Sequence, residues 1–152
     1  MNTRDIATVL RKDPFARRVF RGVYPRDKLP SSPVTIARHP SAFIINTDTS
    51  RGAGIHWTAV YFFGNGKSVF FDSFGRPPQP DIERFILKNS FSYRFNNRLL
   101  QDMLSSACGL YVIYFVLQTS RGISLNRLLA VFHHLKLNTN DRTVLRLVKP
   151  FL

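Results

Sequence analysis

The chain has 152 residues, of which 44% are hydrophobic and 20% are charged. This length suits one domain with a hydrophobic core, and the apolar content argues against an intrinsically disordered chain. The 22 Lys and Arg residues outnumber the 9 Asp and Glu residues, which gives a net charge of +13. Such an excess favours a polyanionic partner, above all nucleic acid bound without sequence specificity. The alternative is a basic surface that contacts only water.

The sequence carries no signal for export or for membrane insertion. Its longest apolar run, Gly109–Leu117, is shorter than the roughly 18–20 residues that cross a bilayer. The N-terminus carries Arg4 and Asp5 and lacks the apolar stretch of a signal peptide. We therefore expect a soluble single domain over residues 1–152, with no membrane partner.

The start of the chain predicts a helix followed by irregular structure. Residues Thr3–Lys12 are expected to form a short helix with Thr3 as N-cap, ended by Asp13-Pro14. The stretch Gly22–Pro40 is rich in proline, so we expect it to wrap the surface without regular structure.

Three apolar runs with strand-forming composition come next. They are Ala42–Asn46, Ile55–Phe63 and Ser68–Asp72, and Gly64–Lys67 between the last two is typical of a tight hairpin. Both alternating faces of Ile55–Phe63 are largely apolar. This strand is therefore expected to be central and covered on both sides.

The second half of the chain is expected to be mainly helical. The segment from Cys108 to about Thr119 is apolar almost all round, which predicts a helix buried in the core. The other expected elements are a helix over Asp81–Lys88, a strand over Tyr93–Leu99, an amphipathic helix over Leu125–Leu137 capped by Ser124, and a short segment over Arg142–Val148. Together the elements predict an α+β fold, in which a small, mostly antiparallel sheet packs on a buried central helix.

Cys108 is the one cysteine in the chain, so it is either an inert buried residue or a nucleophile. It stands in the first turn of the predicted central helix, where unpaired backbone N–H groups and the helix dipole favour an anion. Its neighbours Ala107 and Gly109 leave room for a substrate carbonyl. One Cys and four scattered His residues do not readily supply a tetrahedral zinc site, so no metal is expected.

His56 is the candidate base, because an imidazole in an otherwise apolar strand needs hydrogen-bond partners. With a turn near Asn65 and Gly66, residues whose numbers sum to about 130 face each other across the hairpin. His56 and Asp72 sum to 128, so the two are expected to be near neighbours. Asp72 would then orient the imidazole, and the alternative is that it only caps the turn after it.

Two further sets of side chains are weaker candidates. Gln101 precedes Cys108 by seven residues, and its amide could join the Cys108 backbone N–H in an oxyanion hole. The alternative is a solvent-facing turn residue. The arginines Arg17, Arg18 and Arg21 form a basic run that could contact nucleic acid.

Four motifs occur in a fixed order along the chain: Gly54-Ile55-His56-Trp57, Phe71-Asp72-Ser73-Phe74-Gly75, Gln101, and Ser106-Ala107-Cys108-Gly109-Leu110. The set resembles the adenovirus protease family (adenain) and, more broadly, the cysteine-protease clan that includes the SUMO-specific proteases. Phe20–Tyr24 and Phe43–Thr47 also resemble adenain, so the likeness covers roughly residues 15–118.

The resemblance implies an adenain-like cysteine endopeptidase in which Cys108 is the nucleophile and His56 its base. It implies that Asp72 orients the base, that Gln101 and the Cys108 N–H bind the oxyanion, and that Trp57 packs beside the His–Cys pair. The substrates would be viral precursor proteins cleaved near Gly-Gly or Gly-X sites during virion maturation. The resemblance also implies a place in the host cell nucleus and in the virion, and stimulation by DNA. We expect a monomer.

Two features depart from the adenovirus enzymes. Those enzymes usually carry Glu where Asp72 stands, although the SUMO-protease branch uses Asp. Their activating peptide is joined through a disulfide to a cysteine other than the nucleophile, and here the one cysteine is Cys108. Activation is therefore expected to be non-covalent, or the enzyme is active alone. No organic cofactor is implied.

Three other functions stay open at this point. A deubiquitinase or SUMO-type isopeptidase would use the same residues on a folded modifier. A related acyltransferase would use the same Cys, His and acidic residue on an acetyl donor. A basic DNA-binding protein without enzymatic activity would keep its function when Cys108 is replaced by Ala.

Overall fold

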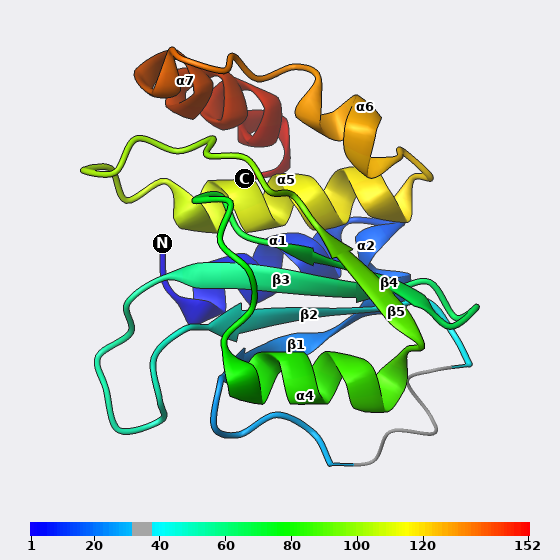
Figure 1. Cartoon of the computed structure of the whole chain (residues 1–152). Coiled ribbons are helices and arrows are strands. Elements are labelled where there is room, and N and C mark those ends of the chain that lie inside the picture. The colour runs from blue at the N-terminus through cyan, green and yellow to red at the C-terminus, as the bar shows by residue number, and fades with distance from the viewer. Residues whose placement is uncertain (32–37) are drawn as a thin grey trace.

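Five strands form one mixed sheet in the order β1-β2-β3-β4-β5, in a computed structural model that describes residues 1–31 and 38–152 (Figure 1). The strands are Phe20–Pro25 (β1), Ser41–Asn46 (β2), Trp57–Phe62 (β3), Lys67–Phe71 (β4) and Ser92–Phe95 (β5). The pairings β2–β3 and β3–β4 are antiparallel, and the outer pairings β1–β2 and β4–β5 are parallel. The predicted α+β class is confirmed, while the sheet is mixed because both edge strands join it in parallel.

The strand β1 was not expected, because it lies partly within the proline-rich stretch predicted to be irregular. As an edge strand, β1 tolerates glycine and proline. Gly22 lies at a shift in the register of β1 against β2, and Pro25 is the last residue of the strand. Gly22 has a φ of 140°, a conformation that favours glycine. The remainder of the predicted irregular stretch includes residues 32–37, which lie outside the described residues.

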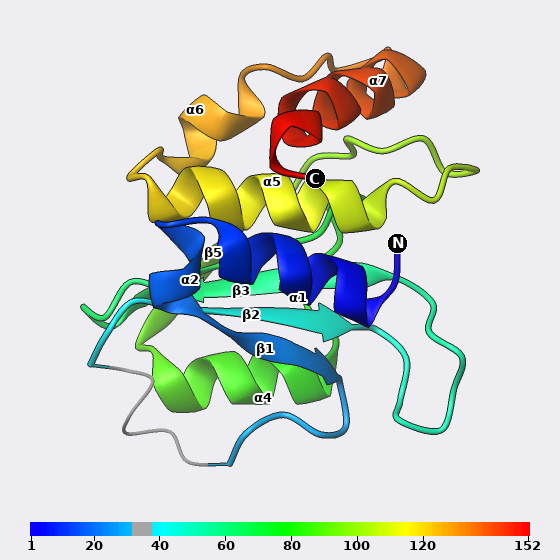
Figure 2. The same cartoon turned by 180° about the vertical axis from the view of Figure 1, so that it is seen from behind.

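One face of the sheet is covered by the central helix α5 (Cys108–Ser120), together with α1 (Thr3–Lys12) and α2 (Ala16–Val19) (Figures 1 and 2). Nine residues of α5 are buried, all of them between Gly109 and Thr119. The Phe115 ring stacks on Phe71 of β4, with 4.8 Å between ring centroids and 9° between ring planes. The prediction of a helix buried on every side is confirmed, because helices cover the face of α5 that turns away from the sheet.

The opposite face of the sheet is covered by α4 (Pro80–Asn89), close to the predicted bounds. The rings of Phe43, Phe62 and Phe85 meet there edge to face, with centroids 5.3 to 5.9 Å apart. The central strand β3 is therefore covered on both sides, as predicted from its two apolar faces. No helix in the described part of the chain is long and apolar enough to span a membrane.

The predicted helix over Leu125–Leu137 is wrong, because the chain leaves the helix after α6 (Leu125–Leu129) and begins α7 at Leu137 (Leu137–Val148). The side chain of Asn140 accepts a hydrogen bond from the His133 N–H at 2.6 Å and donates one to the His133 carbonyl at 2.8 Å. Contacts from a distant side chain thus replace the helical hydrogen bonds that the periodicity of the segment had suggested. A short 3-10 turn, η1 (Lys149–Phe151), follows α7.

Two smaller predictions need correction. The N-cap of α1 is Asn2 rather than Thr3, and Asn2 and Asp5 bond each other's backbone N–H in a capping box. The strand predicted over Tyr93–Leu99 ends at Phe95. From there the Asn96 side chain, instead of backbone groups, pairs with the backbone of Asp72, the residue after β4. Its Oδ1 accepts from the Asp72 N–H at 2.8 Å, and its Nδ2 donates to the Asp72 carbonyl at 2.6 Å.

The substitution Phe115→Ala tests the packing of α5 on the sheet. We expect it to lower the free energy of unfolding by about 3–5 kcal/mol, because it removes a buried ring and leaves a cavity. Phe91→Ala is the matched control, since Phe91 is 94% exposed and its loss should change the value by less than about 0.5 kcal/mol. Urea denaturation measures both variants, and equal effects would contradict the described core.

Candidate active site

The three residues predicted to form a catalytic group lie together at one end of the sheet. Cys108 is the first residue of α5, His56 directly precedes β3, and Asp72 directly follows β4. The register of the β3–β4 hairpin is the predicted one, because Ala59 pairs with Phe71. This pairing carries the chain on one side to His56 and on the other to Asp72.

His56 and Asp72 form a close buried pair. His56 Nε2 lies 2.6 Å from Asp72 Oδ1, and the two residues are only 8% and 4% exposed. Because the carboxylate can only accept, Nε2 carries the hydrogen and the other ring nitrogen, Nδ1, is left for Cys108. This contact is the one expected if an acidic residue orients His56.

Asp72 also caps the turn after it, in addition to its contact with His56. Its Oδ1 accepts a second hydrogen bond from the Phe74 N–H at 2.9 Å. The backbone of Asp72 is held on its other side by the Asn96 amide. With backbone and carboxylate both tied, Asp72 presents one oxygen to the imidazole in a fixed position.

Phe74 supports His56 through a contact that the sequence did not predict. The two rings stack with centroids 4.4 Å apart and planes 22° apart. The guanidinium of Arg76 lies 5.3 Å from the centroid of the Phe74 ring. The only signal in the sequence was an aromatic residue two positions after Asp72, and its position against the imidazole depends on the turn.

The pKa values of Cys108 and His56 move toward an ion pair. Burial acts to raise the pKa of Cys108, but the neighbouring His56 imidazole and the backbone N–H groups of Trp57 and Gly109 hold it below its usual range. Burial acts to lower the pKa of His56, but the hydrogen bond to Asp72 and the neighbouring Cys108 sulfur raise it to about 9. Both shifts favour the thiolate and imidazolium forms over the two neutral forms.

The head of α5 adds to the stabilisation of a thiolate. Ala107 occupies the N-cap position and makes no side-chain cap, so no capping side chain competes for the N–H groups of the first turn. These groups and the helix dipole favour negative charge on the Cys108 sulfur. They are also suitable donors for an oxyanion that forms next to it.

Gln101 is only 1% exposed, so the alternative prediction of a solvent-facing turn residue is wrong. Its Oε1 accepts from the Ser73 hydroxyl at 2.6 Å, and its Nε2 donates to the Ser105 carbonyl at 2.8 Å. The amide has one further N–H hydrogen. That hydrogen is the group with which Gln101 could bind an oxyanion.

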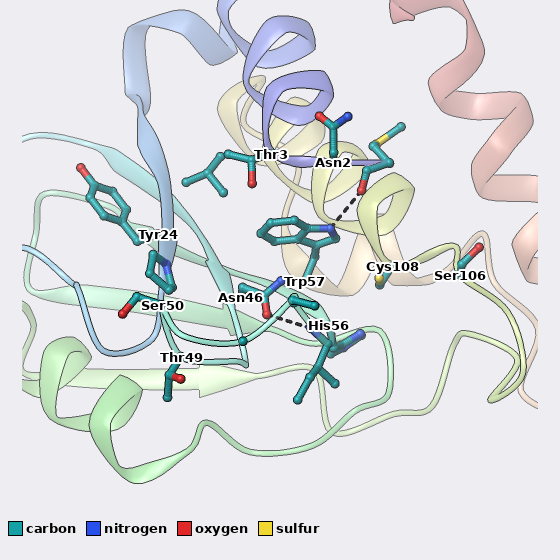
Figure 3. A pocket seen from close by; sticks show the side chains of 17 residues that line it. Asn2, Thr3, Tyr24, Asn46, Thr49, Ser50, His56, Trp57, Ser106 and Cys108 are labelled. Carbon is teal, nitrogen blue, oxygen red and sulfur yellow. Dashed lines mark hydrogen bonds between the residues drawn. The ribbon is translucent and has the colours of Figure 1, made fainter.

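The Cys108–His56 pair opens on a cavity of about 570 Å³ (Figure 3). Trp57 is part of its wall, and the indole N–H donates to the Met1 carbonyl at 3.3 Å. Asn46 and Tyr24 line the cavity as well. In Figure 3 Cys108 and His56 lie at one end of the cavity and Tyr24 at the other. The cavity therefore offers space for an extended substrate beside the sulfur.

The predicted basic run lies away from this cavity. Arg17 and Arg18 are exposed on α2, and Arg21 is exposed on β1, where it bonds Ser41 and the Pro40 carbonyl. In both Figures 1 and 2, α2 lies by the end of α5 opposite to its first residue. Within residues 1–31 and 38–152, no group of three or more His, Cys, Asp or Glu is placed to hold a metal ion.

Comparison with known protein families and with curated protein sequences finds no match. Solved structures do share the fold. A crystal structure of the ASFV pS273R protease has a TM-score of 0.70 and 12% identity, over 95% of this chain and 65% of that chain. A selenomethionine structure of the same protease has a TM-score of 0.61 and 15% identity, over 93% of this chain and 64% of that one.

This chain has the fold of the ASFV pS273R protease. It spans a little under two thirds of that protein's length. At these identities the likeness concerns the fold alone. The resemblance to adenain itself stays a prediction, because both of these structures are of the ASFV enzyme.

The pH dependence of Cys108 alkylation tests the ion pair. Because the pKa of Cys108 is lowered, iodoacetamide should react rapidly at pH values below the ordinary thiol pKa of about 8.5, where an ordinary thiol is mostly protonated. His56→Ala removes the hydrogen bond and charge that lower this pKa, so the reaction should move to higher pH. His134→Ala, at an exposed His, is the matched control. A wild-type midpoint near the ordinary thiol value of about 8.5 would contradict the pair.

Proposed function

We propose that this chain is a cysteine endopeptidase of the adenain type, with Cys108 as nucleophile, His56 as base and Asp72 orienting the base. The observation that carries the proposal is the 2.6 Å contact of His56 Nε2 with Asp72, which leaves Nδ1 for the cysteine at the head of α5. The lowered pKa of Cys108 supports the nucleophilic role. The fold shared with a viral protease supports the reaction class.

The reaction begins with attack of the Cys108 thiolate on the scissile carbonyl carbon. A carbon–sulfur bond forms, and the carbonyl oxygen becomes an oxyanion that the Cys108 N–H and the Gln101 amide stabilise. His56, as imidazolium, gives its proton to the leaving amine, and the carbon–nitrogen bond breaks. Water then attacks the thioester while His56 takes its proton, which releases the carboxylate product and restores the thiolate.

The activity should depend on pH in a bell shape. The acidic limb is the protonation of Cys108, whose pKa lies below its usual range. The alkaline limb is the loss of the His56 proton at about 9, because neutral His56 cannot protonate the leaving amine. Asp72→Asn removes the charge that supports the imidazolium, so the alkaline limb should move to lower pH. A kcat/KM profile measures both limbs, and an unmoved alkaline limb would count against the role of Asp72.

The substrates proposed from the adenain resemblance are viral precursor proteins cleaved beside Gly-Gly or Gly-X. We expect cleavage of peptides with Gly-Gly before the scissile bond, and loss of that cleavage in Cys108→Ala. Ser106→Ala is the control at the neighbouring cavity residue. Mass spectrometry of the products locates the cleaved bond. An inactive wild-type protein, with and without DNA, would contradict the proposal.

The same assay separates the other functions that these residues would allow. Cleavage of a folded ubiquitin-like fusion, with peptides left intact, would favour a SUMO-type isopeptidase. Formation of an acetyl thioester on Cys108 from acetyl-CoA would favour an acyltransferase. The endopeptidase is the proposal because the fold is that of a protease.

DNA is the proposed non-specific partner, supported by the net charge of +13 and the exposed Arg17 and Arg18. The double variant Arg17→Ala/Arg18→Ala should bind duplex DNA more weakly, with the slope of log K against log [salt] reduced by about 2. Arg142→Ala/Arg146→Ala, two exposed arginines on α7, removes the same charge as control. Titrations at several salt concentrations measure the slopes, and equal losses would contradict a site on α2.

The adenain resemblance also suggests where and with what the enzyme works. We propose a monomer that acts in the host cell nucleus and in the virion, with no metal or organic cofactor. Because Cys108 is the one cysteine, any activating peptide would bind without a disulfide.

A further inference from the structure

Ser73 is a buried residue that lies next to Asp72 and has no assigned role. It is 0% exposed, and its hydroxyl donates to Gln101 Oε1 at 2.6 Å. Its backbone carbonyl accepts from the N–H groups of both Leu100 and Gln101, at 2.8 and 3.1 Å. Ser73 therefore holds Gln101 at its backbone and at the end of its side chain.

The direction of the Gln101 amide follows from its two partners. The Ser105 carbonyl can only accept a hydrogen bond, so the group 2.8 Å from it must be the amide nitrogen. The amide oxygen then faces Ser73, whose hydroxyl must donate. If the amide turned over, its oxygen would face the Ser105 carbonyl and two acceptors would repel each other. Ser73 and Ser105 thus select one orientation, which fixes the line of the second Nε2 hydrogen.

We propose that Ser73 is a positioning residue that keeps the Gln101 amide aimed at the developing oxyanion. The inference rests on the proposed nucleophilic chemistry of Cys108 and on the proposed oxyanion role of Gln101, and it adds a residue that does not touch the substrate. Without the Ser73 hydroxyl, Gln101 Oε1 would be buried without its donor. The amide would then be held only through its nitrogen by the Ser105 carbonyl, and the direction of the donor to the oxyanion would be less well fixed.

The adjacency of Asp72 and Ser73 gives this arrangement a structural basis. Asp72 holds the base through its carboxylate, and Ser73 holds the oxyanion donor through its hydroxyl. The side chain of Asn96, the residue after β5, bonds both the N–H and the carbonyl of Asp72 and so holds the backbone at this point. Two consecutive residues at the end of β4 therefore set the positions of both groups that assist Cys108.

Two reactions of Cys108 separate positioning of the oxyanion donor from a general structural effect. With p-nitrophenyl acetate, the thiolate attacks the ester carbonyl, a tetrahedral oxyanion forms, and p-nitrophenolate leaves as the thioester is made. With iodoacetamide, the thiolate displaces iodide and no oxyanion forms. Cys108 is the one cysteine, so both reagents report on the same sulfur.

We expect Ser73→Ala to slow the acylation by about tenfold or more, because it loosens an oxyanion donor, and to change the alkylation by less than about twofold. Ser68→Ala is the matched control, since Ser68 is also buried and is hydrogen-bonded to the Ser90 hydroxyl and the Ser92 carbonyl, near the start of β4 rather than beyond its end. It should leave both reactions unchanged. If Ser73→Ala slows both reactions equally, or neither, the proposal is overturned.

Two further variants keep the test decisive if Ser73→Ala folds poorly. Ser73→Thr keeps the hydroxyl, so it should restore the ratio of acylation to alkylation. In a Gln101→Ala background, Ser73→Ala should cause no additional loss of acylation, because the amide it positions is gone. An additional loss of the full size would show that Ser73 acts through another group.

This test is independent of the natural substrate. One outcome is that the wild-type protein cleaves no peptide while Ser73→Ala still lowers the ratio of acylation to alkylation. In that case the endopeptidase proposal fails and the role of Ser73 stands. If peptides are cleaved and Ser73→Ala is indistinguishable from Ser68→Ala, the role of Ser73 fails while the protease stands.

Discussion

The site depends on the register of one hairpin. Ala59 pairs with Phe71, and this pairing carries His56 and Asp72 to within 2.6 Å of each other. Because successive side chains of a strand point to opposite faces, a slip of one residue would turn one partner of this pair away. The aromatic and β-branched side chains of both strands resist such a slip, since it would expose the rings packed on α5 and α4. The stability of the core and the geometry of the candidate base thus have the same origin.

Burial and charge oppose each other at this site, and pairing decides the outcome. Burial alone would keep Cys108 a neutral thiol and His56 a neutral imidazole. Each instead shifts toward its charged form, because the other residue, Asp72 and backbone N–H groups supply partners. A helix with no side-chain cap at its start contributes to this balance. The same enclosure that penalises an isolated charge therefore strengthens the interactions within the pair.

Support for the site comes from residues whose side chains replace regular backbone pairing. Asn96 continues the β4–β5 pairing with its amide after the strand has ended. Asn140 takes up the backbone of His133 where a helix had been expected. Its Nδ2 also donates to the Leu100 carbonyl at 3.0 Å, next to Gln101. Asn140 and Ser73, from two other parts of the chain, thus fix the segment that carries Gln101.

The sequence by itself determined the strands β2, β3 and β4, the tight hairpin, and the buried helix that begins at Cys108. These features follow from local composition and periodicity, which act over a few residues. From them the proximity of His56 and Asp72 could be calculated by simple counting across the turn.

The tertiary structure decided the rest. It made Phe20–Pro25 an edge strand, divided the helix predicted over Leu125–Leu137, and stacked Phe74 on His56. It also turned the Gln101 amide by means of Ser73 and Ser105. Each of these outcomes depends on a hydrogen bond or contact between residues that local patterns do not connect. Such contacts can be identified only once the chain has folded.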